Sequence, residues 1–196
     1  CKKTAKAPPT LKAPDAGVSY FDLAKSTFFL NRTNVSGVIK GGVIGGMKQL
    51  GKYKIDARFN KQDLINRIKK IYSAKSRITV SNYDGIQFIN NLDKKKNEIF
   101  IYLDSPYFKK GADLYMNYYL QQDHRRLSKN VKNLHKKWMV SYDNQEFIFN
   151  LYAEKQKVIH QLSQSASNRV GNEIFIFSEK IQFIDSMNAL KSAELC

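Results

Sequence analysis

Cysteine is nearly absent from this chain. Of 196 residues only Cys1 and Cys196 are cysteine, one at each end. A disulfide framework needs several cysteines at internal spacings, and a zinc site needs paired ligands, so we predict neither disulfides nor a metal site. Without a disulfide framework, a reducing cytoplasm is the predicted compartment.

Long apolar runs are also missing. No segment approaches the ~18 consecutive apolar residues of a membrane span, so we predict no membrane association. The basic start, Cys1 to Thr10, has no apolar segment behind it and therefore does not read as a secretory signal. The chain does not open with methionine, and we expect it to be a piece of a longer protein.

Acidic residues are scarce relative to basic ones. Seventeen Asp and Glu stand against 33 Lys and Arg, which gives a formal net charge of +16. A polyanion is the natural partner of such a chain, because neutralising phosphates drives binding. The alternative is a soluble protein with a basic surface, and charge does not separate DNA from RNA or an anionic membrane. Aromatic residues are plentiful, with 12 Phe and 11 Tyr, which argues against a disordered chain.

Hydrophobic periodicity divides the chain into helices, strands and one long loop. Asn60 offers a helix cap with Asp63 three residues later, and apolar residues then recur on one face. Residues 34–54 hold six of the ten glycines and predict a loop or hairpin. Strands that alternate with helices indicate an α/β sheet with crossovers. We expect helices over residues 20–30, 61–73, 85–92, 123–136 and 145–152, and strands over 78–82, 97–103, 137–142, 158–162 and 173–177.

An acidic loop follows one of these strands. Asp104-Ser105-Pro106-Tyr107 comes directly after an apolar, aromatic run. Ligands of open α/β sheets bind beyond the carboxyl ends of the strands, so the loop is well placed for chemistry. We expect the strand 98–103 to be central and parallel, with the loop lining a cleft. An exposed edge strand, or an Asp104 that points away from any cleft, would overturn the catalytic assignment. An ordinary turn is the alternative, because Asp, Ser and Pro are common turn formers.

The surroundings of this loop resemble a known enzyme family. The segments Phe100-Ile-Tyr-Leu-Asp-Ser-Pro-Tyr107, 111–119, 123–124 and 138–144, with 28–33 and 51–54 upstream and 168–171 and 173–177 downstream, resemble the D12 class of N6-adenine-specific DNA methyltransferases. The resemblance covers roughly residues 20–185. It implies an α/β fold with a Rossmann-like methyltransferase sheet, partial and lacking its first strands, and a mainly helical target-recognition region inserted before the catalytic strand. The implied boundaries are 1–19 for a linker or truncated end, 20–75 for target recognition, 76–185 for the catalytic region and 186–196 for a tail.

The resemblance also implies a reaction, methyl transfer from S-adenosylmethionine to a flipped adenine. By analogy, the Asp104 carboxylate and the Ser105 carbonyl accept hydrogen bonds from the N6 amino group, and Asp104 also borders the cofactor. Pro106 holds the loop and Tyr107 stacks on the base. The family's usual form is Asp-Pro-Pro-Tyr, so Ser105 departs from it and puts the rigidity of the loop in doubt. Asp84 resembles a further cofactor-contacting position, although an Asx turn explains it equally well.

Basic residues near the glycine-rich segment are the predicted DNA contacts. Lys and Arg can neutralise phosphates or read guanine, and Tyr can pack on sugar or base. Each lysine taken singly could equally be a solvated charge. The predicted contacts are Arg32, Lys40, Lys48, Lys52, Tyr53, Lys54 and Arg58.

The family's N-terminal Phe-x-Gly-x-Gly cofactor motif has no match in this chain. Gly41-Gly-Val-Ile-Gly-Gly46 is glycine-rich, but it follows no predicted strand, and we interpret it as a hairpin. We therefore predict the target-recognition and catalytic part of the enzyme, with double-stranded DNA as partner, a cognate restriction endonuclease as a possible companion, and a monomeric state. The alternative function is a non-catalytic DNA-binding remnant. A weaker alternative is the same methyl-transfer reaction with RNA as the substrate.

Overall fold

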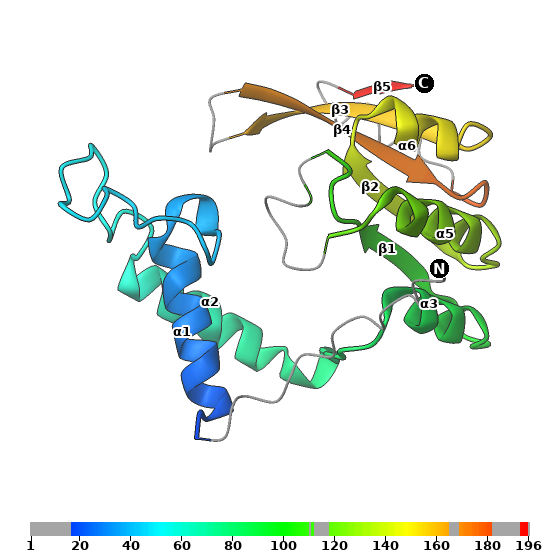
Figure 1. The fold of residues 1–196 in the computed structure, drawn as a ribbon. Coiled ribbons are helices and arrows are strands. Elements are labelled where there is room, and N and C mark those ends of the chain that lie inside the picture. Colours follow the sequence, from blue (N-terminus) through cyan, green and yellow to red (C-terminus); the bar gives the residue numbers. More distant parts are fainter. Residues whose placement is uncertain (1–16, 110, 112–117, 165–168, 182–192, 196) are drawn as a thin grey trace, which may run out of the picture. The chain divides into compact units, whose positions relative to one another are not determined.

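The structure is a computed structural model that describes residues 17–109, 111, 118–164, 169–181 and 193–195. The chain divides into two compact units, Cys1–Asn82 and Tyr83–Cys196 (Figure 1). Each unit is described by itself below.

Unit 1 contains two helices, α1 (Tyr20–Thr33) and α2 (Lys61–Ser73). The Ser19 side chain accepts a hydrogen bond from the Asp22 amide, which fixes where α1 begins. The Asn60 side chain does the same for the Asp63 amide at 3.1 Å, so the predicted cap and the predicted bounds of α2 are confirmed. Two short 3₁₀ turns follow the helices, η1 (Val35–Gly37) and η2 (Lys75–Arg77).

A long loop joins α1 to α2, as the glycine content predicts. A single antiparallel bridge, Asn34 to Val43, closes its first part. Gly45 has a φ of +87°, and a Cβ there would lie 2.7 Å from the Tyr53 carbonyl oxygen, so only glycine fits. The Gly41–Gly46 segment is therefore part of a turn-rich loop and follows no strand.

Unit 2 is a mixed sheet with helices, which confirms the predicted α/β class. The strand order is β1-β2-β4-β3-β5; β1 and β2 run parallel, and the remaining neighbours are antiparallel. The helix α5 lies between β1 and β2 in the chain, as a parallel crossover requires. In chain order the elements are α3 (Gly85–Asp93), β1 (Phe100–Asp104), α5 (Gln121–Lys132), β2 (Lys137–Asp143), α6 (Glu146–Leu151), β3 (Gln156–Gln164), β4 (Arg169–Phe177) and β5 (Ala193–Leu195).

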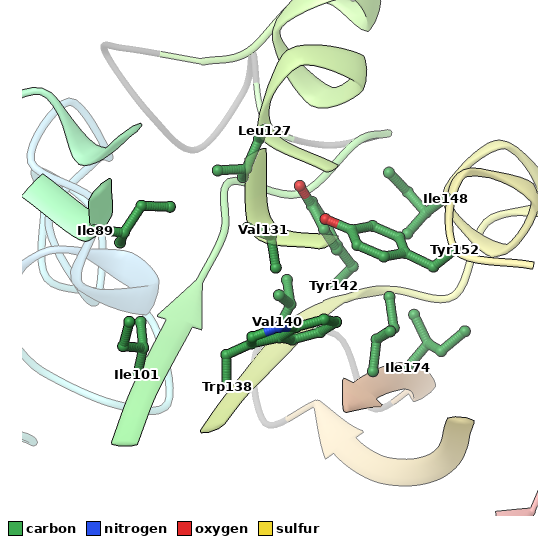
Figure 2. Close-up of a cluster of buried hydrophobic side chains, with 11 residues drawn as sticks. Ile89, Ile101, Leu127, Val131, Trp138, Val140, Tyr142, Ile148, Tyr152 and Ile174 are labelled. Atoms are coloured by element: carbon green, nitrogen blue, oxygen red, sulfur yellow. The ribbon is translucent and has the colours of Figure 1, made fainter. Parts of the chain in front are cut away.

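The core of unit 2 lies between the helices and one face of the sheet. Trp138, Val140 and Tyr142 alternate along β2 and are almost completely buried (Figure 2). Side chains from α3, α5 and α6 pack against them, which places these helices on that face. The remaining core residues are Ile89, Ile101, Leu127, Val131, Ile148, Tyr152, Ile174 and Ile176.

The other face of β1 is open to solvent in the described part of the chain. Phe100, Tyr102 and Asp104 alternate with the core-facing residues, and the two aromatic residues are 55% and 50% exposed. This is unusual for a parallel strand, because parallel sheets are normally covered on both faces.

Two sequence predictions about strands are wrong. Residues 78–82 form no strand: Ile78 and Val80 are exposed, and no strand in the described part of the chain pairs with them. The strand 100–104 is parallel, as predicted, but it is not central. It stands at one end of the sheet, and β2 is its one partner among the described residues.

Other boundaries differ by a few residues. The α5 helix begins two residues before the predicted 123 and ends at Lys132, four residues early, because Asn133 caps it. The strands β3 and β4 are longer than predicted and form a regular antiparallel pair. A short strand, β5, lies in the segment expected to be a tail.

Candidate active site

Asp104 is the last residue of β1, and its side chain is tied to the neighbouring strand. Ser141 is its register partner on β2. The Ser141 hydroxyl donates to the Asp104 carboxylate at 3.3 Å, and the Tyr102 and Ser141 hydroxyls lie 2.9 Å apart. Asp104 itself stays exposed. The carboxylate is thus oriented from one side and open to a ligand on the other.

Ser105 turns into the protein. Its side chain is buried beside Tyr142, and its hydroxyl meets no partner with full hydrogen-bond geometry among the described residues. Burial raises the pKa of the Tyr142 hydroxyl well above its ordinary range, so this group is neutral.

Two carboxylates hold the next part of the loop. The Tyr107 hydroxyl donates to Oε1 of Glu173 on β4. The Phe108 and Lys109 amides donate to the two carboxylate oxygens of Asp143, at 2.7 and 3.0 Å. Residues 104–109 are therefore fixed by partners on both β2 and β4.

Aromatic contacts complete the anchoring of the loop. The Phe108 ring stacks on Phe147 of α6 with 4.5 Å between centroids. It also meets the edge of His124, whose ring is buried between α5 and the loop. His124 Nδ1 lies 3.3 Å from the Tyr142 hydroxyl. His124 therefore packs in the core near the start of α5.

Asp84 caps α3. Its carboxylate accepts from the Gln87 amide at 3.0 Å, and Arg126 lies 3.9 Å away. This is the capping geometry that an Asx-type turn would give. Asp84 follows an irregular segment, however, and not the predicted strand. One carboxylate oxygen is engaged in the cap, and the other faces Arg126.

The residues predicted to contact DNA all lie in unit 1 and fall into two groups. Lys40, Lys48, Lys52 and Tyr53 are exposed, with the Lys52 ammonium 5.6 Å from the centre of the Tyr53 ring. The side chains of the other three are engaged or enclosed within unit 1. The Lys54 ammonium donates to the Gln49 carbonyl, and Arg58 donates to the Asn34 carbonyl at 3.5 Å. Arg32 lies on α1, and its Nε is buried without a hydrogen-bond partner among the described residues.

A comparison with protein families identifies the chain. The model of the D12 class N6 adenine-specific DNA methyltransferases matches residues 14–167. The chain belongs to this family. The matched range contains α1, α2, the loop after β1 and its partners on β2. A search of the curated proteins found no match.

No helix in the described part of the chain is long and apolar enough to cross a membrane. The members of the family act on DNA, as the family description states.

Sequence reasoning found the acidic loop but missed most of what holds it. Ser141 and Glu173 lie 37 and 66 residues from their partners, and only the sheet register brings them together. Asp143 stands in a segment that resembles the family, but its role as the acceptor for two loop amides depends on geometry. A polar residue on the same face as Asp104, at a matched strand end, is the signal that could have indicated Ser141.

Proposed function

We propose that this chain carries the target-recognition and catalytic part of a DNA adenine-N6 methyltransferase. The observation that supports this most is the loop 104–109 of a D12-family chain, which follows a parallel strand and exposes one oriented carboxylate. Catalysis of amine methylation needs acceptors held in fixed positions, and five residues from four elements hold this loop. These residues are Ser141, Asp143, Phe147, His124 and Glu173.

The proposed roles follow from the chemistry of the target. An adenine within a duplex is unreachable, so the base is flipped out of the stack. Its N6 amino group has two N–H donors, which the Asp104 carboxylate and the Ser105 carbonyl accept. These bonds orient the nitrogen for in-line attack and stabilise the positive charge that develops on it. Tyr107 stacks on the ring, and Pro106 keeps the two acceptors together.

S-adenosylmethionine supplies an activated methyl group on a sulfonium centre. The described residues fit part of its site: Asp104 is exposed on the open face of β1, and Asp84 is a weaker second candidate, since its carboxylate already caps α3. A close backbone approach of the kind that a glycine turn allows after a first strand is not present among the described residues. We therefore assign to this chain the binding and orientation of adenine, and only a border of the cofactor site.

The position of β1 bears on this assignment, because an exposed edge strand was expected to overturn it. In the described part of the chain, β1 has exposed aromatic side chains and one edge without a partner strand, which is what a strand shows when a neighbour belongs beside it. We propose that a further strand and its helices pair with β1 and cover Phe100 and Tyr102. In that arrangement β1 becomes central and the cofactor site is completed next to Asp104.

Duplex DNA is the proposed partner of unit 1. From residue 23 to residue 55 the chain has six Lys and Arg and no Asp or Glu. Such a segment matches the phosphate backbone, and the four exposed contacts lie within it. Lys40, Lys48, Lys52 and Tyr53 are the proposed direct contacts. Arg32, Lys54 and Arg58 are further proposed contacts, of which Lys54 and Arg58 also stabilise the loop.

A non-catalytic DNA-binding remnant is the second candidate, and the open edge of β1 is the observation that favours it. The two candidates differ in what Asp104 does. In the full-length protein, Asp104→Ala should lower methyl transfer to adenine by at least about a hundredfold, because the acceptor for N6 is gone. DNA affinity should stay within a few fold, because it comes mainly from phosphates.

The measurement is tritiated-methyl incorporation into duplex DNA beside a binding titration. Glu98→Ala is the matched control, since Glu98 is an exposed carboxylate near the start of the same strand and pairs with Lys137. Wild-type rates in Asp104→Ala would remove this residue from the mechanism. A wild-type protein that binds DNA and transfers no methyl group would favour the remnant.

A further inference from the structure

Two like-charged residues face each other across β2 and β4. Asp143 and Glu173 are direct register partners in this antiparallel pair. Like charges directly opposite each other destabilise a sheet. Among the described residues neither carboxylate takes part in an ion pair with Lys, Arg or His. The repulsion between the two carboxylates therefore has to be offset by other contacts.

Both carboxylates are instead directed at one segment of the loop. Glu173 accepts from the Tyr107 hydroxyl, and Asp143 accepts from the Phe108 and Lys109 amides. Three consecutive residues are thus bound by two acids that lie side by side. Hydrogen bonds to charged acceptors are about twice as strong as neutral ones, so these contacts offset the repulsion between the carboxylates.

We propose that Asp143 and Glu173 form a clamp of positioning residues that holds the Tyr107 ring in position for the target base. This inference rests on the proposed function, in which Tyr107 stacks on the flipped adenine. Neither acid is proposed to contact the substrate. They act through Tyr107 and through the backbone of the two residues after it.

The geometry explains why such a clamp is useful. A tyrosine side chain turns about two bonds, and a base that stacks on a mobile ring loses the alignment of its amino group. Tying the far end of the ring to Glu173 and the backbone to Asp143 restrains both ends of the residue. A displacement of about 1 Å at a reacting group can lower a rate by about a hundredfold.

The test is a double-mutant cycle in the full-length enzyme on a duplex that the wild type methylates. Tyr107→Phe removes the hydroxyl and keeps the ring, and Glu173→Ala removes the acceptor. Glu173→Gln keeps an acceptor oxygen of the same reach. Glu179→Ala and Glu179→Gln are the matched controls, because Glu179 is an exposed carboxylate beyond the same strand, paired with Lys155.

We expect each single variant of the cycle to lower kcat by about tenfold to a hundredfold with little change in KM. The double variant should be no slower than the slower single variant, because both remove the same interaction. Glu173→Gln should recover most of the rate, and the Glu179 variants should match the wild type. A duplex with 2-aminopurine at the target position should show altered base fluorescence in Glu173→Ala.

Stability separates positioning from a structural role. Removing Glu173 relieves the repulsion with Asp143, so Glu173→Ala should melt within about 3 °C of the wild type or above it. A loss of rate with a large loss of stability would assign Glu173 a structural role and overturn the proposal. Rate effects that multiply in the double variant would overturn it as well.

Failure of the proposed function gives a different pattern. If the wild type transfers no methyl group, the free energies of unfolding of the wild type, Tyr107→Phe, Glu173→Ala and the double variant decide whether the clamp exists. A coupling of two- to a hundredfold in the unfolding equilibrium between Tyr107→Phe and Glu173→Ala supports it. Independent effects of the two changes overturn it.

Discussion

The imidazole of His124 is enclosed by three aromatic rings, those of Phe108, Tyr119 and Tyr142, at centroid distances of 5.4 to 5.5 Å. The side chain is fully buried, and its Nε2 has no hydrogen-bond partner among the described residues. Burial lowers the pKa of His124 below its ordinary value of 6.5, against the opposing effect of Asp143 and Asp123. The neutral ring is therefore part of the packing behind the acidic loop.

This burial makes the stability of unit 2 sensitive to acid. In the unfolded chain His124 takes up a proton near pH 6.5, whereas in the folded chain it resists protonation until a lower pH. The stability that the neutral ring contributes is thus complete above pH 6.5 and is lost as the pH falls below it. The slope is at most about 1.4 kcal/mol per pH unit. We expect denaturant unfolding at pH 7.5 and 5.5 to show this loss, and His124→Phe to reduce it.

His135 offers the matched control for this measurement. Its side chain is 87% exposed beside Asp93 and lies outside the core. The acid-dependent loss should persist in His135→Phe. An unchanged slope in His124→Phe would mean that another group governs the acid response of this unit.

At the scale of elements, Gln49 organises the loop between α1 and α2. The nitrogen of its side-chain amide donates to the Ile44 and Gly46 carbonyls at 2.9 and 2.7 Å. The oxygen of the same side chain, Oε1, accepts from the Ile55 amide at 2.8 Å. Gln49 also adopts a positive φ of 52°. One side chain thus joins both sides of the segment that exposes Lys48 and Lys52.

Replacing Gln49 should loosen this loop. Each lost hydrogen bond contributes about 1 kcal/mol, so Gln49→Ala should speed amide exchange at Ile55 by about tenfold to a hundredfold. DNA affinity should fall too, because the lysines lose their fixed spacing. Hydrogen exchange measured by NMR checks the first effect. Gln62→Ala is the control, since in the described contacts the Gln62 side-chain amide donates only to Asn66, on the exposed surface of α2. Equal exchange rates at Ile55 in both variants would contradict the role of Gln49.

The elements also show how far a sequence can predict this fold. The helix α2 was predictable because its cap and its apolar stripe are local. The segment 78–82 has a similar β-branched pattern to the true strands, yet it forms none, because a strand exists only through its neighbours. Asp104 follows an apolar run directly, but this pattern also fits a turn, and the family resemblance of the surrounding segments was needed to assign it a catalytic role. Glu173 was not found, because its partner is set by the register of β2 with β4.

At the scale of the whole molecule, the charge favours DNA binding, whereas the sheet supplies only part of a catalytic site. The formal net charge of +16 and the acid-free segment 23–55 equip the chain for DNA. The open edge and open face of β1 leave the surroundings of Asp104 unfinished in the described part of the chain. We therefore expect this chain by itself to keep DNA binding and to lose most of the methyl transfer.

We predict that the 196-residue chain binds duplex DNA in a salt-dependent way and transfers little methyl. With several phosphate contacts, affinity should fall by orders of magnitude between roughly 50 and 200 mM salt. Methyl transfer should be weak because the chain contains no Phe-x-Gly-x-Gly segment to approach the cofactor, and each ~1.4 kcal/mol of lost cofactor binding costs about tenfold in affinity.

Calorimetric titration with S-adenosylmethionine, a salt series of DNA binding and a tritiated-methyl assay test these points on one preparation. Lys48→Ala and Lys52→Ala together should lower DNA affinity and flatten its salt dependence, because both side chains are exposed in the acid-free segment. Lys94→Ala and Lys96→Ala, exposed after α3, are the matched control and should leave both unchanged. Micromolar cofactor binding with robust transfer would show that the 196 residues already hold a complete cofactor site, and the added strand beside β1 would then have no catalytic part to play.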